Sequence, residues 1–359
     1  MSTAMSSIIR INGNYLEGGG QILRAALALS CITKKPFEIY DIRKGRDKPG
    51  LKSQHLYCIK ALEKLYNAKT EGAEIGSMHL KFWPGEIRGG TLSLDLETAG
   101  SITLVLQSLI LPSIFAKEQT RLKIRGGTDV AWSIPIDYFN HVFIPCIVKY
   151  ADITLDILSR GYYPKGGGFV DIKLNSKVLV FENNELESIV APPLKLTSQG
   201  KLTRIYGISH ASESLKKQEV AERQAKIAKR VLANFGANLE CPIKIDIQYW
   251  QTLSPGSGIA LFALFDSGCI LAGDALGEKG KRSEDVGTEA AEKLVYEIKS
   301  GATVDVHLAD NLVPFLALFG GEIKTSNLSS HTMTNLYTTQ LFLGERLKYN
   351  SKEATIFSI

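Results

Sequence analysis

The chain has 359 residues, 44% of them hydrophobic and 22% charged, which is typical of a globular protein with two or three domains. A net charge of +5 permits a polyanionic partner without requiring one, and the five cysteines contain no CxxC pair, which argues against a zinc site or a disulfide framework. The longest apolar run, Ile102–Ala116, is too short and too polar to cross a bilayer, and the first residues lack a signal-peptide pattern, so we expect a soluble, cytoplasmic protein without a membrane partner.

The first predicted unit opens with a strand at Ile8–Ile11, followed by Glu17–Gly18–Gly19–Gly20 and an apolar helical pattern. The glycines therefore precede a helix N-terminus, where free N–H groups and the positive end of the helix dipole attract anions. Glu17 could hold a divalent cation there and Arg24 a phosphate. A glycine triplet in this position is more often a simple turn, so the motif alone favours no activity.

A basic loop follows the second predicted strand, Phe37–Ile42, and leads into a second helix at 50–67. Its cations are Arg43, Lys44, Arg46, Lys48 and Lys52. Gln54 and His55 occupy the first turns of the helix. A cluster of this kind is more often a solvated loop than a binding site.

The chain then repeats itself. The segment Phe82–Gly90 leads through a proline and glycines into an alternating strand, and Tyr162–Gly168 does the same. Predicted helices at 100–116 and 134–151 alternate with strands at 120–126 and 152–159, and a third copy has helices at 283–300, 308–318 and 330–343 and strands at 302–306 and 322–327. A period of about 80 residues predicts an α+β fold of tandem βαβαββ repeats, with helices packed on one face of four-stranded sheets.

Between the second and third copies the pattern breaks at Val190–Pro193. A strand at 202–209, an amphipathic helix at 212–235 and two further strands then form a segment with its own secondary structure. We predict a repeat-built core of residues 1–183 plus 278–359, which carries the active site, and a smaller α/β inserted domain of residues 184–277.

His331 stands at the start of the predicted helix 330–343, among hydroxyl residues suited to capping it. A helix N-terminus disfavours imidazolium, which leaves a neutral ring nitrogen able to act as a nucleophile. A lone histidine is more often a cap or a hydrogen-bond partner in the core. Upstream, Asp310 follows His307 at another strand-to-helix junction. Asp310 is best interpreted as an ordinary helix N-cap, and it could equally bind a ribose or a base.

Familiar catalytic motifs are missing from the sequence. The absence of HExxH, of a P-loop and of Gly-x-Ser-x-Gly argues against a zinc protease, a P-loop ATPase and an α/β-hydrolase. Five other segments, in contrast, stand in the order found in RNA 3′-terminal phosphate cyclases: EGGGQILR at 17–24, RKGRDKPGLKSQH at 43–55, the glycine-rich segment at 160–168, LADN at 308–311 and SHTMTN at 330–335. Over essentially the whole chain, the protein resembles this family.

The resemblance implies an activity and a site. It makes His331 the nucleophile that takes AMP from ATP, after which AMP passes to an RNA 3′-phosphate and the neighbouring 2′-hydroxyl displaces it to give a 2′,3′-cyclic phosphate. It makes Glu17 the acid associated with a divalent cation, Mg or Mn. The residues that the resemblance assigns to ATP are Arg24, Arg43, Gln54, Gln107, His307, Leu308, Ala309, Asp310 and Asn311.

Many relatives have tyrosine at the position of His307 and glutamine at that of Asn311, so base stacking and one hydrogen bond could differ here. The partners implied are ATP and an RNA with a 3′-terminal phosphate, with no obligate protein partner evident. Two alternatives stay open: a non-catalytic, RNA-binding cyclase-like protein of ribosome assembly, which lacks the histidine, and an enolpyruvyl transferase, which stacks about six similar units.

Overall fold

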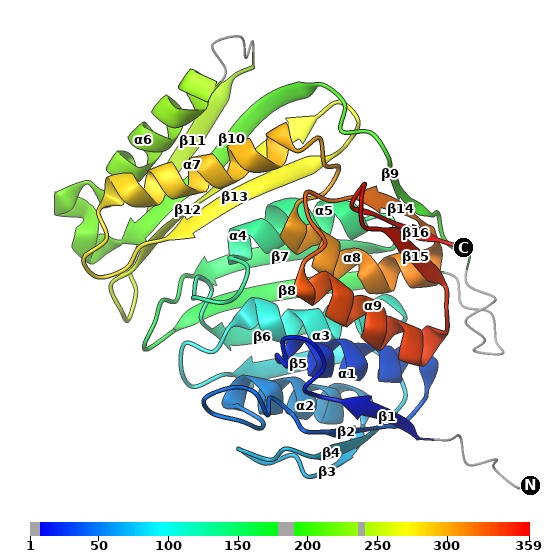
Figure 1. Ribbon diagram of the computed structural model, residues 1–359. Coiled ribbons are helices and arrows are strands. Elements are labelled where there is room, and N and C mark those ends of the chain that lie inside the picture. The colour runs from blue at the N-terminus through cyan, green and yellow to red at the C-terminus, as the bar shows by residue number, and fades with distance from the viewer. Residues whose placement is uncertain (1–7, 179–189, 236–240) are drawn as a thin grey trace, which may run out of the picture.

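The computed structural model describes residues 8–178, 190–235 and 241–359, and it contains the same unit three times (Figure 1). In the first unit, β1 (Ile9–Asn12), α1 (Gln21–Thr33), β2 (Phe37–Tyr40), α2 (Ser53–Tyr66), β3 (Lys69–Glu71) and β4 (Leu80–Trp83) follow one another. Their sheet has the order β1-β2-β4-β3, with β1 and β2 parallel and the other pairs antiparallel.

The second unit repeats this order with one irregular helix. It consists of β5 (Gly90–Asp95), α3 (Ile102–Ile114), β6 (Thr120–Gly126), β7 (Ala151–Ser159) and β8 (Gly168–Ser176), in the sheet order β5-β6-β8-β7. The helix predicted at 134–151 is divided into α4 (Ile136–Tyr138), a π-helical turn (Phe139–Phe143) and α5 (Ile144–Ile147). Pro145 explains the break, since it has no N–H to donate to the preceding turn.

The third unit is split by the insertion. It consists of β9 (Leu194–Leu196), α8 (Val306–Phe319), β14 (Gly321–Lys324), α9 (Ser330–Leu343), β15 (Leu347–Asn350) and β16 (Thr355–Ser358). The sheet order β9-β14-β16-β15 corresponds to that of the other two units, which confirms the predicted α+β fold of tandem repeats. The strand predicted at 302–306 does not form, because only Val304 makes a bridge, to Thr325.

The inserted elements form a fourth sheet with its own helices. They are β10 (Leu202–Ser212), a 3-10 turn (Glu213–Gln218), α6 (Val220–Phe235), β11 (Ile243–Trp250), β12 (Ser257–Phe265), β13 (Ile270–Leu276) and α7 (Ser283–Lys299). Figure 1 shows α6 and α7 on one face of this sheet, whose order is β11-β10-β12-β13. The turn at 213–218 replaces the start of the helix predicted at 212–235.

The packing of two elements bears on the predicted boundaries of the insert, 184 and 277. β9 lies inside that range but pairs with β14 of the third unit. α7 lies outside it but buries Ala290, Ala291 and Leu294 in the core of the inserted sheet. Judged by which elements pack together, the inserted segment therefore lies between β9 and α8. A three-residue strand has too little alternation to reveal its partner in the sequence, so the boundaries at 184 and 277 stay a prediction.

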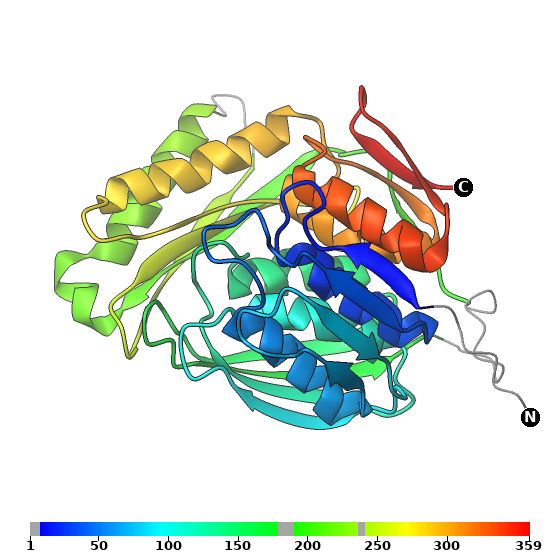
Figure 2. The ribbon, with the colours of Figure 1, turned by 60° about the horizontal axis from the view of Figure 1, so that its bottom comes forward.

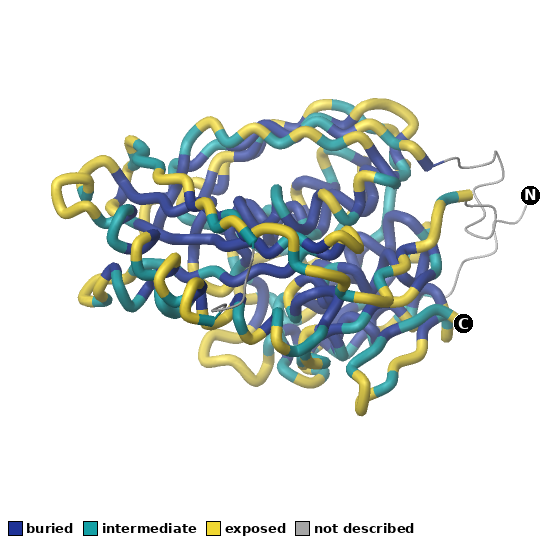
Figure 3. Tube along the Cα trace, turned by 90° about the horizontal axis from the view of Figure 1, so that it is seen from above, coloured by how far each residue is buried: buried dark blue, intermediate teal, exposed yellow. Residues whose placement is uncertain are grey.

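The first helices of the repeats form the centre of the molecule. Every residue from Gln21 to Ile32 of α1 is buried, and α3 is buried on all sides except at Gln107. A helix that is apolar around its whole circumference must be covered on every side, which explains why α1 packs against both α3 and α9. The buried centre is dark blue in Figure 3. Within the described residues, no helix combines the length and hydropathy that a membrane span requires.

Candidate active site

Figure 2 shows the N-terminus of α9 beside the loop before α1. The structure brings His331, at the start of α9, together with Glu17 of this loop. Ser329 caps α9 by accepting a hydrogen bond from the Thr332 N–H at 2.9 Å, so His331 lies in the first helical turn. The imidazole is 46% exposed, and its Nε2 lies 3.3 Å from Glu17 Oε2. The other carboxylate oxygen, Oε1, accepts a hydrogen bond from Arg46 Nη2 at 2.9 Å. The ring therefore points away from the hydrophobic core and is open to a ligand.

Asp310 is not a helix cap, so that prediction is wrong. The cap of α8 is Asp305, whose Oδ1 accepts hydrogen bonds from the N–H groups of His307 and Leu308 at 3.0 and 2.9 Å. The helix begins at Val306, two residues earlier than the sequence pattern indicated, because the predicted strand before it does not form. Asp310 consequently lies in the second turn of α8, on the side that faces α9.

The Asp310 carboxylate joins α8 to the first turn of α9. Its Oδ1 accepts hydrogen bonds from Ser329 Oγ at 2.7 Å and from Thr332 Oγ1 at 2.5 Å. The Asp310 carbonyl accepts a further bond from Asn335 Nδ2 at 2.5 Å. Burial raises the pKa of the Asp310 carboxyl, and the two hydroxyl donors act against that shift. These contacts fix the turn that presents His331.

A chain of side-chain hydrogen bonds crosses from α1 to α8. Arg24 Nε donates to Gln107 Oε1 at 2.9 Å, Gln107 Nε2 donates to Asn311 Oδ1 at 3.0 Å, and Asn311 Nδ2 donates to the His307 carbonyl at 2.7 Å. Arg24 is only 7% exposed, and burial lowers its pKa. Four predicted residues from three different repeats are thus connected.

The three other predicted residues at the start of α8, His307, Leu308 and Ala309, differ in exposure. His307 is exposed, and its ring lies edge-on to Tyr138 with a centroid separation of 6.3 Å. Leu308 and Ala309 are fully buried at 0% exposure and belong to the central hydrophobic core. Their side chains therefore face the interior, whereas His307 is exposed and Asn311 lines a pocket between the helices.

The basic loop is held by its own arginine. Arg43 Nη1 donates to the carbonyls of Lys48 and Gly50 at 3.2 and 3.4 Å, and its backbone is in the left-handed region with φ 54°. Partial burial and the nearby Arg46 lower the pKa of Arg43. Gln54 is half-buried in the first turn of α2 and makes no hydrogen bond through its side chain within the described residues.

His55 is a site residue that the sequence analysis did not assign. It is 2% exposed, and its Nδ1 accepts a hydrogen bond from the Lys52 N–H at 3.0 Å, so the ring proton is on Nε2. That nitrogen faces the glycine-rich loop, since a Cβ at Gly20 would lie 2.2 Å from it and 2.9 Å from Arg24 Nη1. Burial and the neighbouring cations lower the pKa of His55 to about 3. Its position at the end of the basic-loop motif was the available signal.

A small pocket lies between α1, α3, α8 and α9. Its polar lining comes from Gln21, Arg24, Gln107, Asp310, Asn311 and Asn335, and its apolar lining from Ala25, Ala28, Ile110, Leu111, Phe143, Pro314 and Phe315. Apolar walls with a few convergent polar groups are typical of small-molecule sites. His331 and Glu17 lie outside this lining, at the adjoining helix N-termini.

These features define a repeat-built α+β protein whose candidate site joins helix N-termini, cations and an accessible histidine. A model of the RNA 3′-terminal phosphate cyclase family matches residues 15–349, and the chain belongs to that family. The protein of Pyrococcus furiosus named RNA 3′-terminal phosphate cyclase is 45% identical over 344 residues, 94% of each chain. The protein of the same name from Archaeoglobus fulgidus is 41% identical over 355 residues, which cover 97% of this chain and 100% of the relative. The one from Saccharolobus solfataricus is 42% identical over 348 residues, which cover 96% of this chain and 97% of the relative. The enolpyruvyl-transferase alternative is thereby removed.

Proposed function

We propose that this protein is an ATP-dependent RNA 3′-terminal phosphate cyclase that works through a covalent AMP–histidine intermediate. The observation that supports the proposal best is the accessible His331 imidazole beside the Glu17 carboxylate, 3.3 Å away, at the N-terminus of α9. N–H groups at a helix N-terminus attract phosphate oxygens, so the α-phosphate of ATP would be drawn to this nitrogen. The relatives' printed name supplies the substrate, an RNA with a 3′-terminal phosphate.

The reaction has three displacement steps. A ring nitrogen of His331 attacks the α-phosphorus of ATP; the N–P bond forms, the bond to the β-phosphate oxygen breaks, and pyrophosphate leaves. An oxygen of the RNA 3′-phosphate then attacks the same phosphorus, and the N–P bond breaks. The ribose 2′-oxygen finally attacks the RNA phosphorus, loses its proton and expels AMP, which leaves a 2′,3′-cyclic phosphate. Adenylation supplies a good leaving group, and the adjacent hydroxyl is already in place.

The residues of the site suit these steps. Arg24, Arg43 and Arg46 would offset the negative charge of the phosphates, and the Nε2–H of His55 faces the same loop. Glu17 fits a divalent cation, because its two carboxylate oxygens are hard ligands placed between His331 and Arg46. When bound, Mg²⁺ or Mn²⁺ would neutralise charge on the phosphates of ATP.

The alternative within the family is a non-catalytic protein that binds RNA without turning over ATP. The test is incubation with ATP labelled in the α-phosphate and a divalent cation. We expect a protein-bound label that is labile to acid and stable to base, as a phosphoramidate is, and that disappears in His331→Ala.

The matched control is His79→Ala. The His79 ring has a similar exposure, 49%, and a carboxylate partner, Glu38 at 2.6 Å, but lies on the open face of the first sheet. This variant should label as the unaltered protein does. A label that survives in His331→Ala would overturn the proposed nucleophile, and an unaltered protein that never labels would favour the non-catalytic alternative.

A further inference from the structure

Trp132 is the most exposed large hydrophobic residue in the described part of the chain, with 97% of its surface accessible. It lies in the loop between β6 and α4, and its backbone is in the left-handed region with φ 66°. That region favours glycine or asparagine and disfavours a bulky side chain. A tryptophan there gains almost nothing from burial and strains the backbone, so folding does not account for it, whereas strain of this kind gathers at functional sites.

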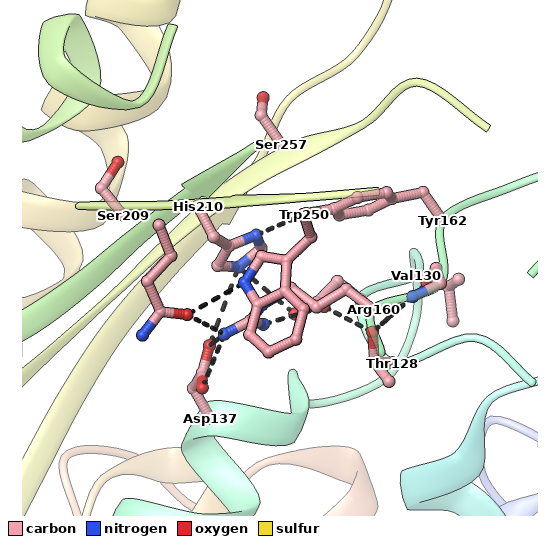
Figure 4. Close-up of polar contacts among 12 residues, drawn as sticks. Thr128, Val130, Asp137, Arg160, Tyr162, Ser209, His210, Trp250 and Ser257 are labelled. Atoms are coloured by element: carbon pink, nitrogen blue, oxygen red, sulfur yellow. Dashed lines mark hydrogen bonds and ion pairs between the residues drawn. The ribbon is translucent and has the colours of Figure 1, made fainter. Parts of the chain in front are cut away.

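The loop that carries Trp132 is firmly anchored at its base. Gly161 of the glycine-rich segment accepts hydrogen bonds from the N–H groups of Thr128 and Asp129 at 2.9 and 3.3 Å. Arg160, 1% exposed, pairs with Asp129 and Asp137 at 3.1 and 2.8 Å. Figure 4 shows this arginine beside His210 and Trp250 of the insert and close to Thr128 at the start of the loop. Asp129, Asp137 and His210 are close enough to hold a metal ion, but Arg160 already neutralises the carboxylates, so the network acts as an anchor.

The same anchor carries a second exposed aromatic residue. Tyr163, 78% exposed, follows Gly161 by two residues, and the neighbouring Lys165 is also exposed. Lys165 has no acidic partner within residues 8–178, 190–235 and 241–359, and its N–H donates to Ser254 Oγ of the insert at 3.1 Å. Two exposed rings and a free ammonium group are therefore presented on loops that are joined at their bases.

The three residues Trp132, Tyr163 and Lys165, called the aromatic rim below, lie on the two loops that follow β6 and β7. β5, β6 and β7 run in the same direction, so the loops after them gather at one edge of the sheet, on the side towards the insert (Figure 1). The helix that follows the Trp132 loop carries Tyr138, whose hydroxyl donates to Asp305 Oδ1 at 2.5 Å and whose ring lies beside His307. α4 therefore connects the loop that carries Trp132 to the N-terminus of α8, just before the LADN segment.

We propose that the aromatic rim binds the unpaired nucleotides upstream of the RNA 3′-phosphate, with the two rings stacking on bases and Lys165 contacting the backbone. Exposed aromatic rings beside a cation form the usual platform for single-stranded nucleic acid, because every base has a π-face and the phosphates attract the cation. An apolar peptide would instead need a groove of aliphatic side chains. The inference rests on the proposed function, since it places the strand whose end reaches His331.

The test compares Trp132→Ala, Trp132→Phe and Trp132→Gly with the unaltered protein. Binding of a fluorescent, unstructured RNA with a 3′-phosphate should weaken about tenfold in the alanine and glycine variants, because stacking of one base on a ring contributes a factor of about 5 to 150. The phenylalanine variant should lose much less. The KM for this RNA should rise similarly, whereas cyclisation of a nucleoside 3′-monophosphate, which lacks upstream bases, should be unchanged. Trp132→Gly should keep or raise Tm, because glycine relieves the backbone strain.

Tyr296→Ala is the matched control: that tyrosine is 59% exposed on α7, and its removal should leave RNA affinity unaltered. Labelling of His331 by ATP, measured without RNA in the same proteins, separates the two proposals, because a failure to label sinks the proposed function alone. Unchanged RNA affinity in Trp132→Ala would overturn the proposal that the rim binds RNA. An equally large decrease in cyclisation of the nucleoside 3′-monophosphate would overturn it as well. A change in the mass of the protein in solution with unaltered RNA binding would show that the rim contacts protein instead.

Discussion

Two carboxylates near His331 have different environments and therefore different roles. Glu17 is partly exposed and pairs with Arg46 and His331, so it can exchange these partners for a cation or a substrate. Asp310 is 6% exposed, and the hydroxyls of Ser329 and Thr332 occupy its Oδ1. We therefore expect Glu17 to take part in binding and Asp310 to position the turn that carries the histidine.

A third carboxyl group predicts how stability depends on pH. Glu297 of α7 is 6% exposed and accepts a hydrogen bond from Ser326 Oγ at 2.9 Å. Burial and the neighbouring Asp305 raise its pKa to about 7. The unfolded chain loses this proton near pH 4.3, so between that pH and 7 the folded state binds more protons than the unfolded state. The free energy of unfolding should consequently fall as the pH rises through this window.

Glu297→Gln removes this titration and keeps the oxygen that accepts from Ser326. At pH 8 the variant should melt at least about 2 °C above the unaltered protein, and at pH 4.5 the two should melt together. Thermal unfolding followed by circular dichroism at both pH values measures the difference. If the difference in Tm were equal at the two pH values, the change of side chain, and not the loss of the titrating proton, would account for it.

At the scale of the element, the N-cap of α9 controls both stability and the nucleophile. Ser329→Ala removes the acceptor of the Thr332 N–H and the donor to Asp310 Oδ1. The loss of a helix cap costs about 1 kcal/mol, and the first turn that carries His331 should fray. We expect a small decrease in Tm and a larger decrease in the rate of labelling by ATP. Ser329→Asp, which restores a cap acceptor, should recover much of the stability; a labelling rate unaffected by Ser329→Ala would show that the cap does not position the ring.

The elements with strong periodicity were predictable and those set by distant contacts were not. α3, β6 and α9 carry long regular patterns, and their predicted ranges differ from the observed ones by at most two residues. β9 could not be recognised, because three residues show no clear alternation and form a strand only through their pairing with β14. The same limit applies to the site: motifs indicated Glu17 and His331 separately, but their contact depends on how α1 and α9 pack, and His55 was hidden within a longer motif.

At the scale of the whole molecule, the repeats explain why the site lies where it does. α1, α3 and α8 are the first helices of the three units, and α1 and α8 both pack against α9. Arg24, Gln107 and Asn311 hydrogen-bond to one another across these helices, so each unit contributes one residue to the chain. The insert lies beside this centre and contacts the core through a buried polar network. His210 Nδ1 shares a hydrogen bond with the Tyr162 hydroxyl at 2.8 Å, and Gln248 Oε1 accepts one from Arg160 Nη2 at 3.3 Å.

That network predicts the consequence of removing the Arg160 guanidinium. Arg160→Met leaves Asp129 and Asp137 buried, at 3% and 1% exposure, without their cation. An uncompensated buried charge destabilises a protein by about 3 kcal/mol or more, so the midpoint of urea unfolding should fall markedly. In the unaltered protein the nearby His210 and Arg160 hold the pKa of Asp129 below its usual range against the opposing effect of burial. Without the arginine the pKa of the Asp129 carboxyl should rise. The loss of stability in Arg160→Met should therefore become smaller as the pH is lowered.

The triple variant Arg160→Met, Asp129→Asn, Asp137→Asn separates charge from shape. It removes the cation and both anions together, so no isolated charge is left in the interior, and asparagine nearly matches aspartate in volume. If charge balance is what joins the insert to the core, the triple variant should unfold at a higher urea concentration than Arg160→Met alone. If the triple variant is as unstable as the single one, the hydrogen-bond geometry around Arg160 matters more than its charge. Because the same anchor lies beneath Trp132, RNA affinity should decrease in Arg160→Met and recover together with the stability.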